Sequence, residues 1–159
     1  PGGRGVFPSM SVRENLEMGS YLLRGDRALQ HERIERVLED LPALVDRLDH
    51  PAGVLSGGQQ QQVALARVLM HEPAVLILDE PSLGLAPPIP AELLDVRARI
   101  KAQRGQSMII VEQSLDVALR IADRAVFMEK GAVRFEGPAS ELAERDDLAR
   151  AVFLGTEGG

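Results

Sequence analysis

The 159-residue sequence contains no cysteine and no tryptophan, and aromatic residues make up only 3% of it. Without cysteine the chain forms neither disulfides nor thiolate metal sites, and cysteine-based catalysis is excluded. The apolar content of 45% is enough for one core of Leu, Val, Ile and Ala, within the ordinary size of a single domain. These absences agree with a reducing compartment and with an aliphatic core.

Long apolar runs and positive charge are scarce as well. Runs such as Ala74 to Leu78 fall far short of the roughly 20 residues that a membrane-spanning helix needs. The formal net charge is −6, which argues against nucleic acid as the main partner. The only lysines are Lys101 and Lys130, and the phosphate-binding sequence G-x-x-x-x-G-K followed by Ser or Thr occurs nowhere. The sequence therefore predicts a chain that does not cross a bilayer and has no phosphate-binding loop of its own.

The first residues predict that the chain begins inside a loop. No initiator Met and no leader pattern is present, and the stretch from Pro1 to Gly5 is rich in turn-forming residues. We therefore expect the true N-terminus to lie upstream.

Hydrophobic spacing predicts helices in the first half of the chain and alternating strands and helices in the second. A capping-box pattern at Ser11 and Glu14 opens the first helix, and Pro42 ends the second. The predicted helices cover residues 11–23, 27–41, 59–70, 91–102, 115–122 and 139–154, and the predicted strands cover 75–78, 108–111, 125–128 and 133–136. A hairpin turn at 130–132 joins the last two strands. This alternation predicts a parallel α/β sheet, with the apolar strand 75–78 buried on both of its faces.

A glycine-rich turn, Leu55-Ser56-Gly57-Gly58-Gln59, opens the third helix. Glycines at 57 and 58 let backbone N–H groups and a helix N-terminus approach an anion, and the Ser56 hydroxyl adds a donor. Taken alone, such a turn favours an ordinary Ser-capped helix.

Two carboxylates, Asp79 and Glu80, follow the strand Leu76 to Leu78 and precede Pro81. Asp79 can hold Mg²⁺, usually through water, while Glu80 can orient or deprotonate an attacking water molecule. The alternative is a pair of solvated acids that end a strand.

Together and in this order, the two segments resemble the signature motif and the Walker B strand of the ATP-binding cassette (ABC) family. The resemblance implies an α/β fold of the P-loop NTPase class, a partial parallel sheet flanked by helices plus a helical subdomain. It covers the C-terminal part of such a domain, with a signature lobe over residues 8–72 and a catalytic lobe over 73–159. It also implies ATP and Mg²⁺ as cofactors, Glu80 and Gln113 as catalytic residues and Asp79 as the metal ligand. The residues that it implies for binding ATP held by the opposite subunit are Ser56, Gly57, Gly58 and Gln59.

Two further positions refine the resemblance. Ser82 lies in a segment similar to the D-loop that joins the two sites of the dimer, and residues 81–87 have the form found in ATPases of branched-chain amino-acid uptake. Gln113 occupies the switch position, where most of the family has a histidine near the γ-phosphate. A glutamine can hydrogen-bond the phosphate but takes no proton, and its alternative is a surface residue at a helix start.

The start of the chain departs from the family pattern. Gly2 stands where the family has a Gln, or in this subfamily a Glu, that senses Mg²⁺ and transmits to the membrane subunit. Phe7 and Met10 are candidates for apolar contacts with a permease, and core packing explains them equally well.

The predicted function is that of the ATP-hydrolysing subunit of an importer, for branched-chain amino acids, incomplete in this chain and inactive alone. The predicted partners are a second ABC ATPase subunit, transmembrane permease subunits and, indirectly, a periplasmic substrate-binding protein, with no nucleic acid. The predicted location is cytoplasmic, peripheral on the inner face of the plasma membrane. The alternatives are a soluble ABC-type ATPase of DNA repair or translation and a non-catalytic module that binds a permease.

Overall fold

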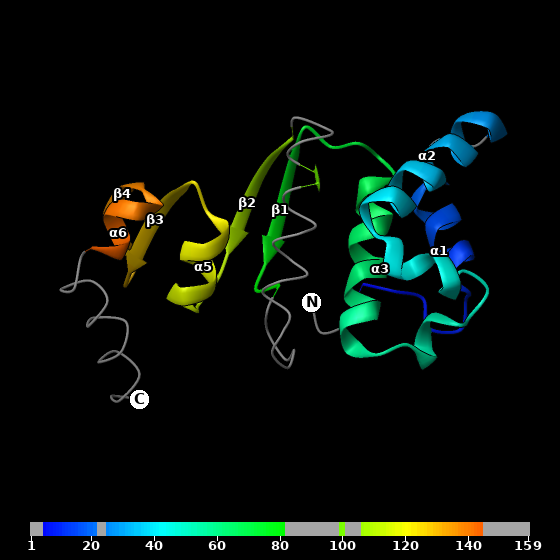
Figure 1. The fold of residues 1–159 in the computed structure, drawn as a ribbon, viewed down its shortest axis with the longest axis horizontal. Helices are drawn as coiled ribbons and strands as arrows, with labels where there is room; N and C mark the ends of the chain where they lie inside the picture. Colours follow the sequence, from blue (N-terminus) through cyan, green and yellow to red (C-terminus); the bar gives the residue numbers. More distant parts are fainter. Residues whose placement is uncertain (1–4, 22–24, 82–98, 101–105, 145–159) are drawn as a thin grey trace. The chain divides into compact units, whose positions relative to one another are not determined.

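The computed structural model describes residues 5–21, 25–81, 99–100 and 106–144 (Figure 1). Contacts between residues group the chain into two compact units. The first contains Pro1–Leu76 and Gly84–Met108, and the second contains Ile77–Leu83 and Ile109–Gly159. The lobes predicted over residues 8–72 and 73–159 stay a prediction.

The first unit is mainly helical. Its elements are α1 (Val12–Gly19), α2 (Arg27–Asp40), the 3-10 helices η2 (Pro42–Arg47) and η3 (Ala52–Val54), and α3 (Gly57–Leu69). The side chains of Ser11, Asp26 and Ser56 cap the three α-helices by accepting hydrogen bonds from first-turn N–H groups. The predicted capping box of Ser11 and Glu14 is confirmed. Helix α3 begins two residues earlier than predicted, at Gly57, because the Ser56 cap places both glycines in the first turn.

The core of this unit is aliphatic, as the composition predicts. The side chains that are at most 1% exposed include Val12, Leu16, Val37, Leu41, Leu44, Val63, Ala66, Leu69 and Met70. On each helix they recur three or four residues apart, so that each apolar stripe faces the other helices. Burying each large side chain contributes about 1.5–3 kcal/mol, which holds α3 against α1 and α2.

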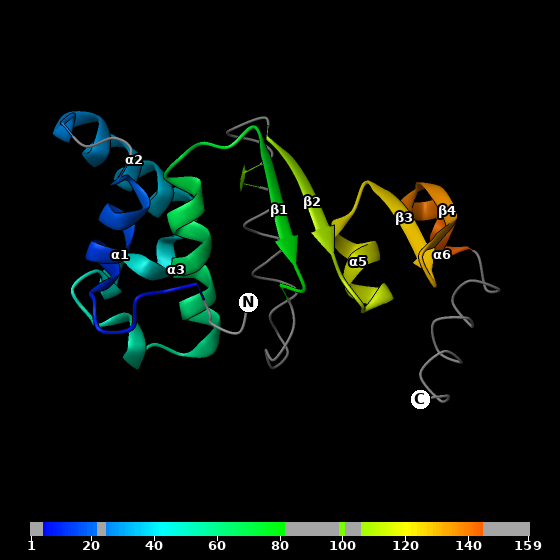
Figure 2. The ribbon, with the colours of Figure 1, turned by 180° about the vertical axis from the view of Figure 1, so that it is seen from behind.

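Helices α1 and α3 lie side by side in both views (Figures 1 and 2) and approach closely at Gly19. A Cβ atom at Gly19 would lie 2.8 Å from the carbonyl oxygen of Arg67. The Arg67 guanidinium lies 4.5 Å from the centroid of the Phe7 ring and donates a hydrogen bond to the Gly5 carbonyl. Burial lowers the pKa of Arg67, although a guanidinium keeps its charge at neutral pH. Helix α3 is thus attached both to α1 and to the segment that precedes α1.

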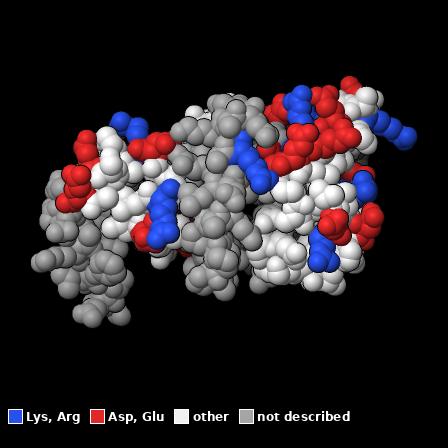
Figure 3. Space-filling model, in the orientation of Figure 1, with Lys and Arg blue, Asp and Glu red and all other residues white. Residues whose placement is uncertain are grey.

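Charged side chains connect the ends of α2 and α3. Acidic residues gather over α2, with basic residues among them (Figure 3). Glu72, just after α3, forms ion pairs with Arg33 and with Arg36, the latter at 2.9 Å. Arg99 donates to the last two carbonyls of α2 at 3.4 Å each, where a cation is favourable.

Strands β1 (Val75–Asp79) and β2 (Ser107–Val111) form a two-stranded sheet. Backbone hydrogen bonds join their starts, from Ser107 N to Ala74 O at 3.2 Å, and their ends, from Glu80 N to Val111 O at 2.8 Å. The two strands therefore run in the same direction, as their arrows show in Figure 1, and the predicted parallel pairing is confirmed.

The prediction that strand 75–78 is buried on both faces is wrong for the part of the chain that the structure describes. Leu76 is 2% exposed, whereas Val75 is 49% and Ile77 is 65% exposed. Successive side chains of a strand point to opposite faces, so the described residues cover the face that carries Leu76 and leave the other open. An apolar run shows that both faces of a strand are suited to burial. It does not show which other segments cover those faces.

The second unit continues with α5 (Leu115–Ile121), β3 (Arg124–Glu129), β4 (Ala132–Pro138) and α6 (Ala139–Ala143). Strands β3 and β4 pair antiparallel, and the predicted turn between them is confirmed, with Lys130 at φ 49° and Gly131 at φ 78°. Helix α6 confirms the start of the helix predicted over 139–154, whose remainder from 145 lies outside the described residues. Most of the helix predicted over 91–102 also lies outside them, and residues 99–100 are helical.

None of the helices in the described ranges is both long and apolar enough to cross a membrane.

Candidate functional site

The turn formed by Ser56, Gly57 and Gly58, called here the Ser56–Gly58 turn, lies at the N-terminus of α3. Ser56 has an extended backbone, with φ −60° and ψ 159°, and its hydroxyl oxygen accepts a hydrogen bond from Gln59 N at 3.3 Å. Gln59 Oε1 in turn accepts a hydrogen bond from Ser56 N at 3.1 Å, which completes a capping box. The Gln59 side chain therefore shapes the turn.

Gly58 leaves open space at this helix end. A Cβ atom at Gly58 would meet no other atom within 4 Å. The first N–H groups of a helix have no acceptor within the helix, and the helix dipole favours negative charge at this end. The Ser56 side chain is exposed and the glycines are half-buried, so that an anion can reach the turn.

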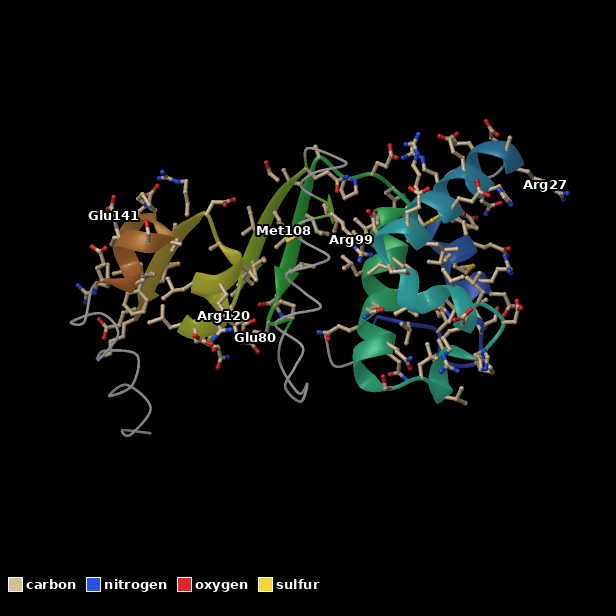
Figure 4. All side chains as sticks on the ribbon, viewed as in Figure 1. Arg27, Glu80, Arg99, Met108, Arg120 and Glu141 are labelled. Carbon is tan, nitrogen blue, oxygen red and sulfur yellow. The ribbon has the colours of Figure 1, made fainter. Side chains whose placement is uncertain are left out.

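Asp79 is the last residue of β1, as the sequence predicts. Glu80 follows directly and lies at the same end of the strand (Figure 4). Glu80 has φ 46°, in the left-handed region that is uncommon for residues other than glycine. Its N–H donates to Val111 O at 2.8 Å, and its Oε1 accepts a hydrogen bond from Gln113 Nε2. Both the backbone and the side chain of Glu80 are thus held by the end of β2 and the residues just beyond it.

Gln113 lies between β2 and α5. Helix α5 begins immediately behind it, because the Ser114 hydroxyl accepts a hydrogen bond from Val117 N at 3.4 Å. Gln113 is exposed, which agrees with the alternative that it is a surface residue at a helix start. Its carboxamide nevertheless donates a hydrogen bond to Glu80. The structure therefore joins two of the predicted site residues that are 33 positions apart.

The carboxylates fit a magnesium ion that arrives with phosphate ligands. Asp79 is exposed and Glu80 is half-buried. In the described residues, no group of three or more Asp, Glu or His is placed to hold a metal ion. Mg²⁺ usually keeps several waters and takes one or two protein carboxylates together with phosphate oxygens. Two neighbouring carboxylates therefore suit a magnesium ion that also binds phosphate oxygens and water. They suit less well an ion whose ligands all come from the protein.

The predicted site residues fall into two sets. The Ser56–Gly58 turn and Gln59 belong to the first unit, and Asp79, Glu80 and Gln113 belong to the second. Ser82 and Gly2 lie outside the described residues.

Two buried polar residues of the first unit are absent from the sequence predictions. Gln60 is 7% exposed and Asn15 is 0% exposed, and both make hydrogen bonds to backbone carbonyls. For Gln60 a signal was available: the apolar spacing of α3 through Val63 and Ala66 extends back by three residues to Gln60, a polar residue at a buried position.

Comparison with known proteins gives a family and a fold. A family model described as ABC transporter matches residues 3–83, just over half of the chain. The chain is 41% identical to the high-affinity branched-chain amino acid transport ATP-binding protein BraG of Pseudomonas aeruginosa, over 98% of this chain and 65% of that protein. It is 34% identical to a probable branched-chain amino acid transport ATP-binding protein LivF of Archaeoglobus fulgidus, over 91% and 61%. It is also 35% identical to the glutamine transport ATP-binding protein GlnQ of Escherichia coli, over 91% and 60%.

Solved structures agree. The structure of cbiO1 from Clostridium perfringens, part of the ABC transporter complex cbiONQ, superposes with a TM-score of 0.81 at 30% identity, over 94% of this chain and 59% of that one. An ATP-binding cassette of another ABC transporter superposes with a TM-score of 0.75 at 27% identity, over 96% and 64%. The α/β fold of an ABC ATPase domain, of the P-loop NTPase class, is therefore confirmed. The chain spans about 60–65% of the length of the curated relatives named above.

Proposed function

Since the chain belongs to the ABC transporter family, we propose that it acts within the ATP-binding and ATP-hydrolysing subunit of an importer. The observation that carries the proposal is the hydrogen bond between Gln113 and Glu80 at the carboxyl end of β1. This hydrogen bond brings a carboxylate and a carboxamide together beyond the carboxyl ends of two parallel strands. Open α/β sheets commonly bind their ligands at these strand ends.

In this proposal Glu80 acts on the attacking water. One carboxylate oxygen, Oε1, accepts the Gln113 hydrogen bond, which leaves Oε2 for the water molecule. Glu80 orients this water and accepts its proton as the water oxygen attacks the γ-phosphorus of ATP. The bond from the γ-phosphorus to the β–γ bridging oxygen then breaks, and ADP leaves with the electron pair.

Gln113 serves as a positioning residue for Glu80 and as a contact for the γ-phosphate. Because a carboxamide neither gains nor loses a proton near neutral pH, Gln113 stays a hydrogen-bond donor there. The positive φ of Glu80 and its backbone hydrogen bond to Val111 also restrict where the Glu80 carboxylate can point. They support the proposal that this carboxylate is held in position for the water molecule.

Asp79 is the proposed ligand of Mg²⁺, held through water. When bound, the ion neutralises charge on the phosphate oxygens. Asp79 precedes Glu80 on an exposed strand end, so the two carboxylates can act on different atoms of one substrate.

The Ser56–Gly58 turn, with Gln59, is proposed to bind the phosphates of ATP held by a second ATPase subunit. Its open helix N-terminus supports this role. Ser82 is proposed to lie between the two sites. The proposed partners are therefore the second subunit and permease subunits, with a periplasmic substrate-binding protein acting indirectly, and the proposed location is the cytoplasmic face of the membrane.

Branched-chain amino acids are the proposed cargo of the importer. The similarity to BraG at 41% identity supports this choice. Relatives named for glutamine, glutamate/aspartate and molybdenum transport are 35–36% identical over somewhat less of the chain, so the preference rests on a modest difference. Without a phosphate-binding loop sequence, the 159-residue chain alone is expected to hydrolyse no ATP.

The test is ATP hydrolysis by the full-length subunit expressed from its gene, compared with its Glu80→Gln variant. We expect kcat to fall by at least about 10²-fold while ATP binding changes by less than about twofold, because the substitution removes the proton acceptor and keeps the shape.

The matched control is Glu129→Gln, the same change at a surface residue of β3 that pairs with Arg134. It should leave kcat unchanged. A Glu80→Gln variant that keeps most of its kcat would refute the role of Glu80, and a wild-type subunit without ATPase activity would refute the proposed function.

A further inference from the structure

Gln60, the residue after the capping-box Gln59, has no role in the function proposed above. It lies in the first turn of α3, two residues after Gly58, and is 7% exposed. We propose that Gln60 is a positioning residue that sets the orientation of the Ser56–Gly58 turn through the backbone carbonyls of the preceding loop.

The carboxamide of Gln60 is directed at three carbonyl oxygens of this loop. Its Nε2 lies 3.0 Å from Ala52 O, 3.2 Å from Leu55 O and 3.4 Å from Gly53 O. A carboxamide nitrogen carries two hydrogens, so one of them is shared between two of these acceptors. The three carbonyls converge on one buried donor, which places the loop on the body of α3.

The other side of the loop is held by the segment before α1. Ala52 N donates to Met10 O at 2.8 Å, and Gly53 N donates to Pro8 O at 2.9 Å. A Cβ atom at Gly53 would lie only 2.9 Å from Pro8 O, so the two segments are in close contact. The loop is therefore held by its N–H groups on one side and by its carbonyls, through Gln60, on the other.

The contact with Leu55 acts directly on the turn. The carbonyl of Leu55 and the N–H of Ser56 belong to the same planar peptide group. Gln60 donates to that carbonyl at 3.2 Å, and Gln59 accepts from that N–H at 3.1 Å. Two adjacent glutamines thus hold one peptide plane from both of its polar ends. The direction of the Ser56 hydroxyl and of the first N–H groups of α3 depends on this plane.

Three substitutions separate positioning from packing. Gln60→Met keeps the size and removes the donor. Gln60→Glu keeps the shape and sets a carboxylate against three carbonyl oxygens. Gln60→Lys restores a donor, because an ammonium group has three hydrogens for the three carbonyls. Gln61→Met is the matched control, since it makes the same change one residue along the same helix.

The catalytic consequence rests on the proposed function, so two measurements are made on the full-length subunit. The first is steady-state ATP hydrolysis. If Gln60 orients the turn that reads ATP, the Met and Glu variants should raise KM for ATP by about tenfold with kcat within about twofold, and the Lys variant should restore KM. A merely structural role would instead lower kcat with the folded fraction and leave KM unchanged, which would overturn the proposal.

The second measurement is amide hydrogen exchange over residues 52–59, which does not depend on activity. The Met and Glu variants should exchange these amides at least about tenfold faster than wild type, with the Lys and Gln61→Met variants close to wild type. Unchanged exchange in the Met variant would overturn the proposal even in an active subunit. If wild type shows no ATPase activity, the proposed function fails, and the exchange result still decides the role of Gln60.

Discussion

Replacement of Asn15 by Leu should destabilise the helical unit by about 2.5–4.5 kcal/mol. Asn15 is 0% exposed, and its carboxamide forms a reciprocal pair with the backbone of Phe7. Its Oδ1 accepts from Phe7 N at 2.8 Å, and its Nδ2 donates to Phe7 O at 3.0 Å. The same nitrogen also donates to Ser11 O at 2.9 Å and lies 3.4 Å from Met10 O. One side chain on α1 therefore holds the backbone of Phe7, Met10 and Ser11.

The expected loss of stability follows from which hydrogen bonds the partners of Asn15 keep in the Leu variant. The three carbonyls retain backbone donors, because Phe7 O accepts from Met10 N, Met10 O from Ala52 N, and Ser11 O from Asn15 N. Their loss should therefore be about 0.5 kcal/mol each. The N–H of Phe7 loses its acceptor, which costs about 1–3 kcal/mol. The sum is a large part of an ordinary total stability of about 5–15 kcal/mol.

The assay is urea unfolding followed by circular dichroism, with Glu17→Ala, an exposed change on the same helix, as the control. Asn15→Asp adds a second readout. It keeps the acceptor for Phe7 N and replaces the donor by an oxygen that faces three carbonyls. This environment raises the pKa of the new carboxyl group in the folded state, so the variant should lose stability as pH rises through that value. A Leu variant within about 0.5 kcal/mol of wild type, or an Asp variant without this pH dependence, would refute the reasoning.

Further predictions concern how α3 is attached to α1 and α2. Gly19→Ala should cost about 1–3 kcal/mol, because the new Cβ would lie 2.8 Å from the carbonyl oxygen of Arg67. Gly58→Ala, with no atom within 4 Å of its Cβ, should leave the melting temperature unchanged or raise it; equal losses in the two variants would contradict the proposed close approach of α1 and α3. Glu72→Gln should cost about 1–2 kcal/mol, because it breaks partly buried pairs with two arginines of α2. Glu35→Gln, in an exposed pair on the same helix, should cost less than about 0.5 kcal/mol, and an equal effect of the two in thermal melts would argue against the link.

The local signals of the sequence were reliable where short-range chemistry decides the structure. The capping box at Ser11 and Glu14 and the turn at Lys130 and Gly131 both form as predicted. Each depends on hydrogen bonds or backbone angles within a few residues, so no distant part of the chain has to be known. The bounds of α2 and β1 also agree with the prediction to within one residue.

The burial of β1 was predicted less well. The apolar run from Val75 to Leu78 predicts two covered faces, and Ile77 is nevertheless 65% exposed among the described residues. Coverage of a strand face depends on which other segments lie against it, and the strand's own residues do not specify them.

The contact between Glu80 and Gln113 is another feature that the sequence alone does not predict. The resemblance to the ABC family implies that both residues belong to the site. Their hydrogen bond exists because β1 and β2 pair in parallel with the register that joins Glu80 to Val111. A shift of the register by one residue would turn the side chains to the opposite face, and pairing between strands is set by the whole sheet.

The sequence by itself determined the order of the elements, the capping box of α1 and the parallel α/β class, which follow from side-chain periodicity and from chemistry between near neighbours. The residues of the candidate site came from the resemblance of two sequence motifs to the ABC family. Only the tertiary structure decided which face of β1 is covered and that Gln113 holds Glu80. It also decided that Gln60 holds the loop before the Ser56–Gly58 turn and that Asn15 holds the segment before α1. The physical reason is that a buried polar side chain takes its partners from whatever backbone folding brings to it, and those partners can be far away in the sequence.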